Sequence, residues 1–135
     1  TIGDFHYYVP ISSAKPKHQK MSNSLDFHKL HEESIGYLYA VLNINNMIPV
    51  PDNCLTQLKY NQVESFRSFS NEKEKTDYVY LLQKEKALID NVQDTLQNKA
   101  LKLYQKCIAK PDSSLAARCC NFKMLEEKCS SYSDT

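Results

Sequence analysis

Apolar residues recur at three- and four-residue steps from Ser24 to about Asn46, a pattern that predicts an amphipathic helix. Pro49 and Pro51 then interrupt the chain, and Pro51 suits the first turn of a second helix. This second helix is less regular, and its predicted inward face consists of Leu55, Leu58, Val63, Phe66 and Phe69.

The stretch 71–110 contains neither proline nor glycine and carries leucine or isoleucine at a strict seven-residue spacing, at Leu82, Ile89, Leu96 and Leu103. The pattern predicts helix throughout. One straight rod would be about 55–60 Å long, too long for a compact domain of this size, so we expect a break near 91–98. Pro111 ends the stretch, Asp112 or Ser113 should cap the next helix, and this last amphipathic helix should end near Cys129.

These elements predict an all-α fold, a compact bundle of four to five helices. Glycine occurs only at Gly3 and Gly36, and this scarcity disfavours tight β-hairpins and glycine-rich phosphate loops. The 135 residues suit one hydrophobic core. We therefore expect a flexible N-terminal arm over 1–23 and a single helical domain over 24–135.

The balance of charge argues against several functions. With 17 basic and 16 acidic residues the net charge is +1, so we expect no nucleic-acid partner. No apolar run approaches the roughly 18 residues that cross a bilayer, so we expect no membrane association. The carboxylates alternate with basic residues along helix surfaces, and no acid–base pair stands out. The sequence thus predicts a protein that is not an enzyme and binds no cofactor.

One cluster has the composition of a metal site. His28, His31 and Glu32 would lie within one helical turn, at spacings that suit a surface metal ion. The same residues flank Leu30 on what would be the solvated face of the first helix. We interpret them as surface residues and predict no metal.

Five cysteines in so short a chain favour a disulfide framework over a set of buried thiols. Two disulfides would staple the bundle, and the fifth cysteine would be a buried thiol, an intermolecular bridge in a homodimer, or a residue whose partner lies in missing sequence. Disulfides indicate an oxidising compartment. The start at Thr1 agrees with removal of a signal peptide, so we expect a secreted, extracellular protein.

The spacing of the last cysteines carries a family resemblance. Twelve residues separate Cys107 from Cys120, and eight separate Cys120 from Cys129. This spacing resembles the last three cysteines of the insect odorant-binding superfamily. The resemblance implies Cys107–Cys129 and Cys54–Cys120 bridges and a helical shell around an apolar ligand site. The Lys-, Asn- and Tyr-rich composition also resembles small helical salivary proteins with which mosquitoes inhibit host complement and clotting.

Two functions follow from this interpretation. The first is a secreted inhibitor that blocks a host plasma protein complex, of the complement or contact and clotting cascades, by protein–protein contact. The alternative is an extracellular carrier of a small hydrophobic or amine ligand, with a pocket lined by some of the nine tyrosines and five phenylalanines. A seam filled by the heptad residues leaves little room for a ligand and favours the inhibitor. Its predicted contact residues are Phe5, Tyr7, Tyr8, Lys15, Lys17 and Lys20.

Overall fold

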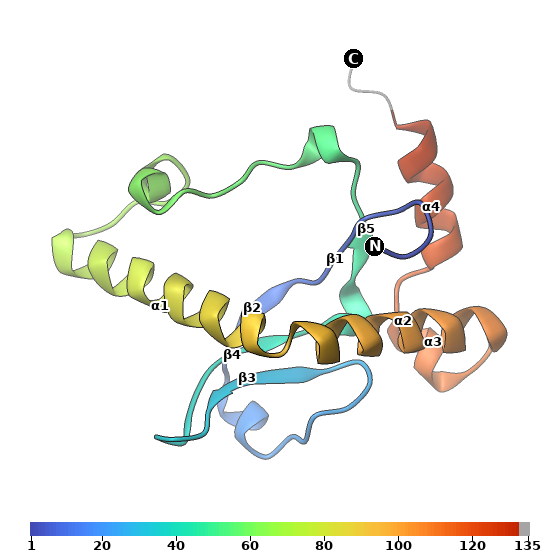
Figure 1. Ribbon diagram of the computed structural model, residues 1–135, viewed down its shortest axis with the longest axis horizontal. Coiled ribbons are helices and arrows are strands. Elements are labelled where there is room, and N and C mark those ends of the chain that lie inside the picture. The colour runs from blue at the N-terminus through green and yellow to red at the C-terminus, as the bar shows by residue number, and fades with distance from the viewer. Residues whose placement is uncertain (133–135) are drawn as a thin grey trace.

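The computed structural model describes residues 1–132, and their fold combines helices with two small antiparallel sheets (Figure 1). The strands are β1 (Tyr7–Tyr8), β2 (Ile11–Ser13), β3 (His28–Glu32), β4 (Tyr37–Leu42) and β5 (Ile48–Pro49). The α-helices are α1 (Glu72–Asn91), α2 (Gln93–Ala109), α3 (Ser114–Arg118) and α4 (Phe122–Ser131). Four 3-10 helices complete the chain: η1 (Pro16–Gln19), η2 (Ile44–Asn46), η3 (Asp52–Cys54) and η4 (Tyr60–Ser65). The prediction of an all-α bundle is therefore wrong.

The sheets bring together segments that are far apart in sequence. The larger sheet has the order β2-β4-β3, and the smaller one pairs β1 with β5. In Figure 1, α1 and α2 cross the molecule as a nearly continuous line, with the β3–β4 hairpin on one side. Both strands of this hairpin pack against α1.

The segment predicted as the first helix is the β3–β4 hairpin. Leu30, Ala40 and Leu42 point to the helices and are 4% exposed or less. Apolar residues at alternate positions suit one face of a strand, and the same residues also satisfy helical spacing, which misled the prediction. Gly36 supplies the turn with a φ of +64°, a left-handed conformation that favours glycine.

The second predicted helix is also absent from the described structure. Residues 50–71 form an arc that contains only η3 and η4 (Figure 1). Val63 is buried, whereas Leu55, Leu58 and Phe66 are exposed. Without an apolar surface to cover, this irregular face does not stabilise a long helix.

The break predicted in the third helix is confirmed. Val92 has φ −120° and ψ 19°, outside the helical range, and it separates α1 from α2. Beyond this break, Leu96 packs on the hairpin and Leu103 is fully buried against Ile44 and Met47. The break lets one heptad pattern serve two different packing surfaces.

The C-terminal region forms two short helices in place of one. Ser113 caps α3 by accepting a hydrogen bond from the N–H of Ala116 at 3.1 Å, as the sequence suggested. Asn121 caps α4 in the same way, accepting from the N–H of Met124. Phe122, the first residue of α4, is buried and belongs to the same core as Leu103.

The predicted disulfide framework is wrong. All five cysteines, Cys54, Cys107, Cys119, Cys120 and Cys129, are free thiols. Cys107 is buried among apolar residues, where a thiol acts as a small hydrophobe. With no disulfide, no odd cysteine remains to argue for a covalent homodimer. The extracellular location stays a prediction.

The predicted arm, 1–23, contributes β1, β2 and η1, and its strands pair with β5 and β4. The division into an arm and a domain over 24–135 stays a prediction, and residues 133–135 of that domain lie outside the described residues. Over residues 1–132, every helix is too short or too polar to cross a bilayer.

Candidate functional site

Residues 15–31, which we call the basic loop, carry four lysines without an ion-pair partner. These are Lys15, Lys17, Lys20 and Lys29, and no described carboxylate lies within ion-pair distance of them. All four lysines of α1, in contrast, are paired with carboxylates, for example Lys73 with Asp77 at 2.7 Å. The positive charge of the basic loop is therefore available to an anionic ligand.

Burial of one histidine fixes the start of this loop. The His18 ring is 6% exposed and packs on Phe27, with ring centroids 5.6 Å apart. Its Nδ1 atom accepts a hydrogen bond from the backbone N–H of Lys15 at 2.9 Å. Burial, and then the charges of Lys17, Lys15 and Lys29, lower the pKa of His18. His18 is thus a neutral anchor for the backbone at Lys15.

Lys29 holds residues 19–23 of the loop in place through hydrogen bonds. Its Nζ atom donates to the carbonyl oxygens of Gln19 and Met21 at 3.3 and 3.1 Å. Its backbone N–H donates to Oδ1 of Asn23 at 2.8 Å. One strand residue therefore fixes the path of residues 19–23.

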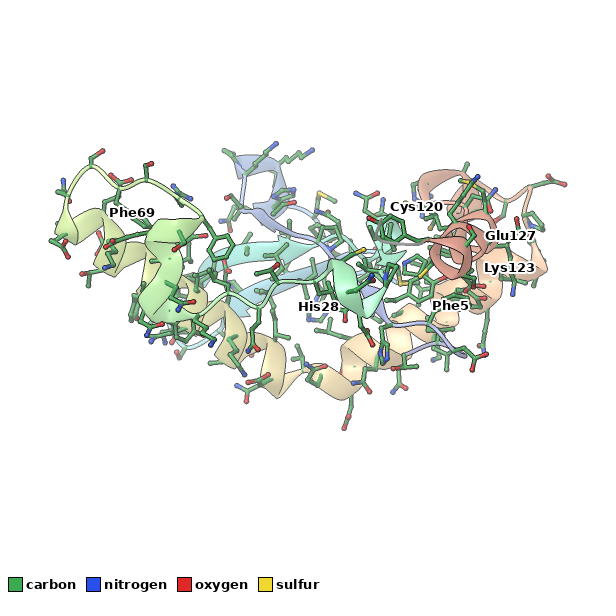
Figure 2. The ribbon with its side chains drawn as sticks, turned by 90° about the horizontal axis from the view of Figure 1, so that it is seen from above. Phe5, His28, Phe69, Cys120, Lys123 and Glu127 are labelled. Carbon is green, nitrogen blue, oxygen red and sulfur yellow. The ribbon has the colours of Figure 1, made fainter. Side chains whose placement is uncertain are left out.

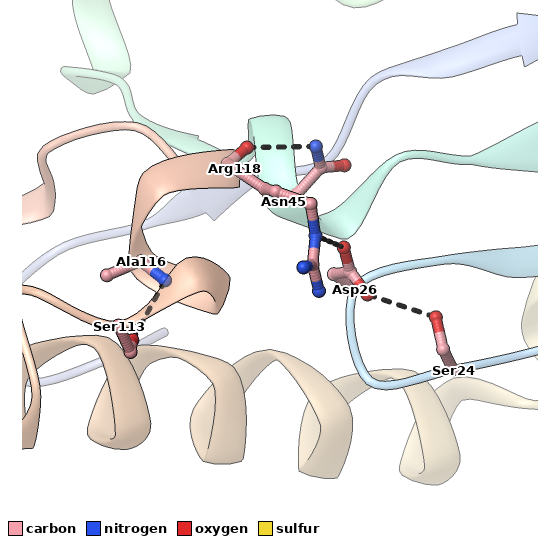
Figure 3. A network of polar contacts seen from close by, with 6 residues as sticks. All are labelled: Ser24, Asp26, Asn45, Ser113, Ala116 and Arg118. Carbon is pink, nitrogen blue, oxygen red and sulfur yellow. Dashed lines mark hydrogen bonds and ion pairs between the residues drawn. The ribbon is translucent and has the colours of Figure 1, made fainter.

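The acidic residue of the loop, Asp26, is neutralised from a distant helix. Figure 3 shows Arg118 at the end of α3 donating to Oδ2 of Asp26 at 3.1 Å, while Ser24 donates to Oδ1 at 3.0 Å. Burial opposes ionisation, but these two bonds hold the pKa of Asp26 below its usual value. Asn45 donates to the carbonyl oxygen of Arg118 and fixes the arginine. Asp26 is thereby prevented from cancelling the lysine charges.

The cluster predicted as a solvated helix face is divided among different surroundings. His28 is buried in β3, with its Nδ1 atom 2.8 Å from Nζ of Lys99. His31 is exposed, and Glu32 accepts from Tyr39 at 2.7 Å and from Lys84 at 3.1 Å. Among residues 1–132, no group of three or more His, Cys, Asp or Glu residues is placed to hold a metal ion.

A groove of about 820 Å³ lies beside the basic loop. Its walls are residues 19–23, residues 28–31 of β3, and the break between α1 and α2. Figure 2 shows His28 near the middle of the molecule, and this residue lines the groove. The groove thus joins the lysines of the loop to the helices.

The predicted contact residues fall into two groups. Lys15, Lys17 and Lys20 lie together on the basic loop. Phe5 lies beside α4 near Lys123 and Glu127 (Figure 2). Tyr8 is exposed in β1.

The last predicted contact residue, Tyr7, belongs to a part-buried polar cluster. Its hydroxyl donates to Glu126 at 2.7 Å, and Tyr104 donates to the same carboxylate at 2.9 Å. Phe5 and Tyr7 therefore lie near Glu126 of α4, apart from the lysines of the predicted site on the basic loop.

His18, His28 and Lys29 were missed as parts of this site. The available signal was local: no carboxylate occurs from residue 5 to residue 25, while three lysines and one histidine fall between 15 and 20. The net charge of the whole chain hid this segregation.

Together, the fold and the basic loop define an α+β protein with a cationic, histidine-containing loop on its larger sheet. Residues 1–130 match the family described as "Toxin ToxN, type III toxin-antitoxin system". The chain belongs to this family.

Two curated relatives are named as endoribonucleases. AbiQ of Lactococcus lactis is 27% identical, in an alignment that covers 96% of this chain and 68% of AbiQ. ToxN of Bacillus thuringiensis is 29% identical, with 98% of this chain and 65% of ToxN covered. The chain thus spans about two thirds of the length of these relatives.

Solved structures share the fold. One belongs to a toxin described as selectively inhibited by a non-coding RNA pseudoknot; it is 27% identical with a TM-score of 0.77, covering 99% of this chain and 76% of that one. The AbiQ structure, described as that of a lactococcal anti-phage endoribonuclease, is 26% identical with a TM-score of 0.75. The alignment covers 95% of this chain and 72% of the AbiQ chain.

These relationships overturn the functional predictions. The resemblance to insect odorant-binding and salivary proteins is wrong, and so are the plasma-protein inhibitor and the ligand carrier. The expectations of no enzyme and no nucleic-acid partner are also wrong, because the curated relatives are named endoribonucleases and the toxin of a similar solved structure is described as inhibited by an RNA. Three cysteines at a common spacing carried too little information to identify a family.

Proposed function

We propose that this chain is an endoribonuclease toxin that holds RNA against its basic loop. The observation that carries the proposal is the group of lysines on the basic loop without a carboxylate partner, Lys15, Lys17 and Lys20 above all, on a protein whose relatives are named endoribonucleases. Lysine ammonium groups neutralise backbone phosphates and supply most of the sequence-independent affinity for nucleic acid.

The reacting phosphate lies at the end of β2 in this proposal. The strand ends at Ser13, whose side chain is exposed, and Lys15 follows two residues later. The ammonium group of Lys15 would stabilise the negative charge that develops on phosphate oxygens during cleavage. His18 positions this segment through its bond to the Lys15 N–H.

A structured RNA that inhibits the toxin would use the same surface. The solved relative is described as inhibited by an RNA pseudoknot, and we extend this partner class to the present chain. Inhibitor and substrate would then compete for the lysines of the basic loop.

Affinity for RNA tests the binding part of the proposal. A labelled single-stranded RNA of about ten nucleotides is titrated with the 135-residue chain at several salt concentrations. The K17Q/K20Q variant should bind more weakly, and the slope of log affinity against log salt should fall by about 0.7 for each phosphate that is no longer neutralised. The matched K73Q/K86Q variant removes two paired lysines of α1 and should bind like wild type. Equal binding by the two variants would contradict the role of the basic loop.

A further inference from the structure

We propose that the groove beside the basic loop is a subsite for the base of one unpaired nucleotide of the bound RNA. This inference rests on the proposed function and adds to it a second recognition element. Phosphates would bind the loop lysines, while one base would leave the strand and enter the groove.

The size and lining of the groove suit a base. Its volume of about 820 Å³ lies in the range of small-molecule sites. Apolar side chains from three elements reach it, at Met21, Leu30 and Leu88. Amides and a hydroxyl accompany them, at Asn23, Asn91 and Thr95. Most of the lining is polar, with apolar side chains among the polar groups. A base suits such a surface because it has a hydrogen-bonding edge and an apolar face.

The break between α1 and α2 supplies one wall. Val92 leaves the helical conformation, and both Asn91 and Thr95 have exposed side chains. Amide side chains of this kind form paired hydrogen bonds with base edges. The break that shortens the helices therefore also brings hydrogen-bonding groups to the groove.

Lys29 fixes the opposite wall before any ligand binds. Its bonds to Gln19, Met21 and Asn23 hold the loop in place. Because Oδ1 of Asn23 accepts from the Lys29 N–H, the amide NH₂ of Asn23 is left to donate to a ligand. A wall that is already ordered loses little conformational entropy on binding.

His28 adds a second donor. Its Nδ1 atom faces Lys99, and no buried nitrogen or oxygen side-chain atom of residues 1–132 lacks a hydrogen-bond partner. The Nε2 atom has no hydrogen bond to the described chain, so it reaches the solvent of the groove that His28 lines. With Nδ1 accepting from Lys99, the neutral ring carries its proton on Nε2.

The groove suits a base better than a second phosphate. Lys29 directs its ammonium group to two carbonyl oxygens, and the carboxylate of Glu33 also lines the groove. A carboxylate repels a phosphate, whereas it can accept from the amino group of a base. Lys20 also lines the groove, so the phosphate of the same nucleotide binds at the edge of the groove, to Lys20 with Lys15 and Lys17, while the base enters it.

Abasic RNA tests the subsite directly. A single-stranded RNA of about ten nucleotides is made with one base at a time removed, so that every phosphate is kept. For wild type we expect one position at which the missing base weakens binding about tenfold, with an unchanged salt slope. A wild-type protein that is indifferent to every abasic position, yet binds intact RNA, would overturn the subsite and leave the proposed function standing.

A filled groove gives the second measurement. The N91L/T95L variant should bind intact RNA about tenfold more weakly than wild type, and abasic positions should cost it nothing further. The matched N98L/Q105L variant changes two exposed polar residues elsewhere on α2 and should behave like wild type. Equal affinity of the two variants would also overturn the subsite. Failure of wild type to bind intact RNA would instead overturn the proposed function. If N91L/T95L does not fold, the abasic series on wild type tests the base subsite by itself.

Discussion

The Nζ atom of Lys99 lies 2.8 Å from Nδ1 of His28, so that two basic side chains meet between α2 and β3. Burial lowers the pKa of both groups, and the charge of Lys99 lowers that of His28 further. His28 is therefore neutral at neutral pH and accepts from the lysine. This pair ties the strand that forms the groove to the helix beyond the break.

Acid should destabilise the protein through this pair. A histidine pKa that is lower in the folded chain means that the unfolded chain binds more protons below about pH 6.5. The free energy of unfolding should therefore fall between about pH 7.5 and about pH 5.5 in urea titrations. Lys99→Met removes the repulsion and should reduce this fall, whereas Lys102→Met, at an exposed position, should not. A fall that is equal in all three proteins would show that Lys99 does not control His28.

The core beneath α2 depends on Leu103. This side chain is fully buried, whereas Leu101 on the same helix is 41% exposed. Leu103→Ala should lower the free energy of unfolding by about 2–5 kcal/mol, because it removes buried methyl groups and leaves a cavity. Leu101→Ala should cost less than about 1 kcal/mol. Similar losses in the two variants, measured by urea unfolding, would contradict the packing described for α2.

The carboxylate of Glu126 depends on its two tyrosine donors. Burial, and then the neighbouring carboxylate, raise the pKa of Tyr7, which therefore stays protonated and donates across the neutral range. Tyr7→Phe should cost about 1–3 kcal/mol, because a buried acceptor loses a partner. Tyr8→Phe changes an exposed hydroxyl and should alter stability by less than about 0.5 kcal/mol. Thermal or urea unfolding of the two variants provides the comparison.

All five cysteines should react as thiols. Alkylation in denaturant without a reductant should add five labels per chain, as counted by mass spectrometry. Prior treatment with dithiothreitol should change neither this number nor the melting temperature. Three labels, or one, would mean that disulfides form and would restore the framework that the sequence suggested.

The helices near the C-terminus could be predicted from the sequence, and the sheets could not. Residues 71–110 lack proline and glycine, so local propensity and tertiary packing agree there, and a break followed from length alone. In the β3–β4 hairpin, Leu38, Ala40 and Leu42 satisfy the two-residue spacing of a strand. Residues such as Leu30, Leu38 and Val41 also satisfy helical spacing. Only the long-range pairing of β4 with β2 decides between strand and helix for this segment.

The net charge of the whole chain concealed the local excess of positive charge on the basic loop. A net charge of +1 describes the whole chain, but the lysines of α1 are neutralised by nearby carboxylates and those of the basic loop are not. Lys15, Lys17 and Lys20 were selected as contact residues for a protein partner, which no observation on the molecule tests. The contribution of His28 depends on Lys99, 71 residues away, a contact that only the folded chain shows.

Cleavage of RNA by the purified chain tests the central claim most directly. A labelled single-stranded RNA is incubated with wild type, with K15Q/K17Q/K20Q and with the α1 variant K73Q/K86Q, and the fragments are separated on a denaturing gel. We predict discrete fragments from wild type and from the α1 variant, and a rate at least about 100-fold lower for the loop variant, because the charges that stabilise the reacting phosphate are removed. Intact RNA after incubation with folded wild type, or equal rates for all three proteins, would contradict the account.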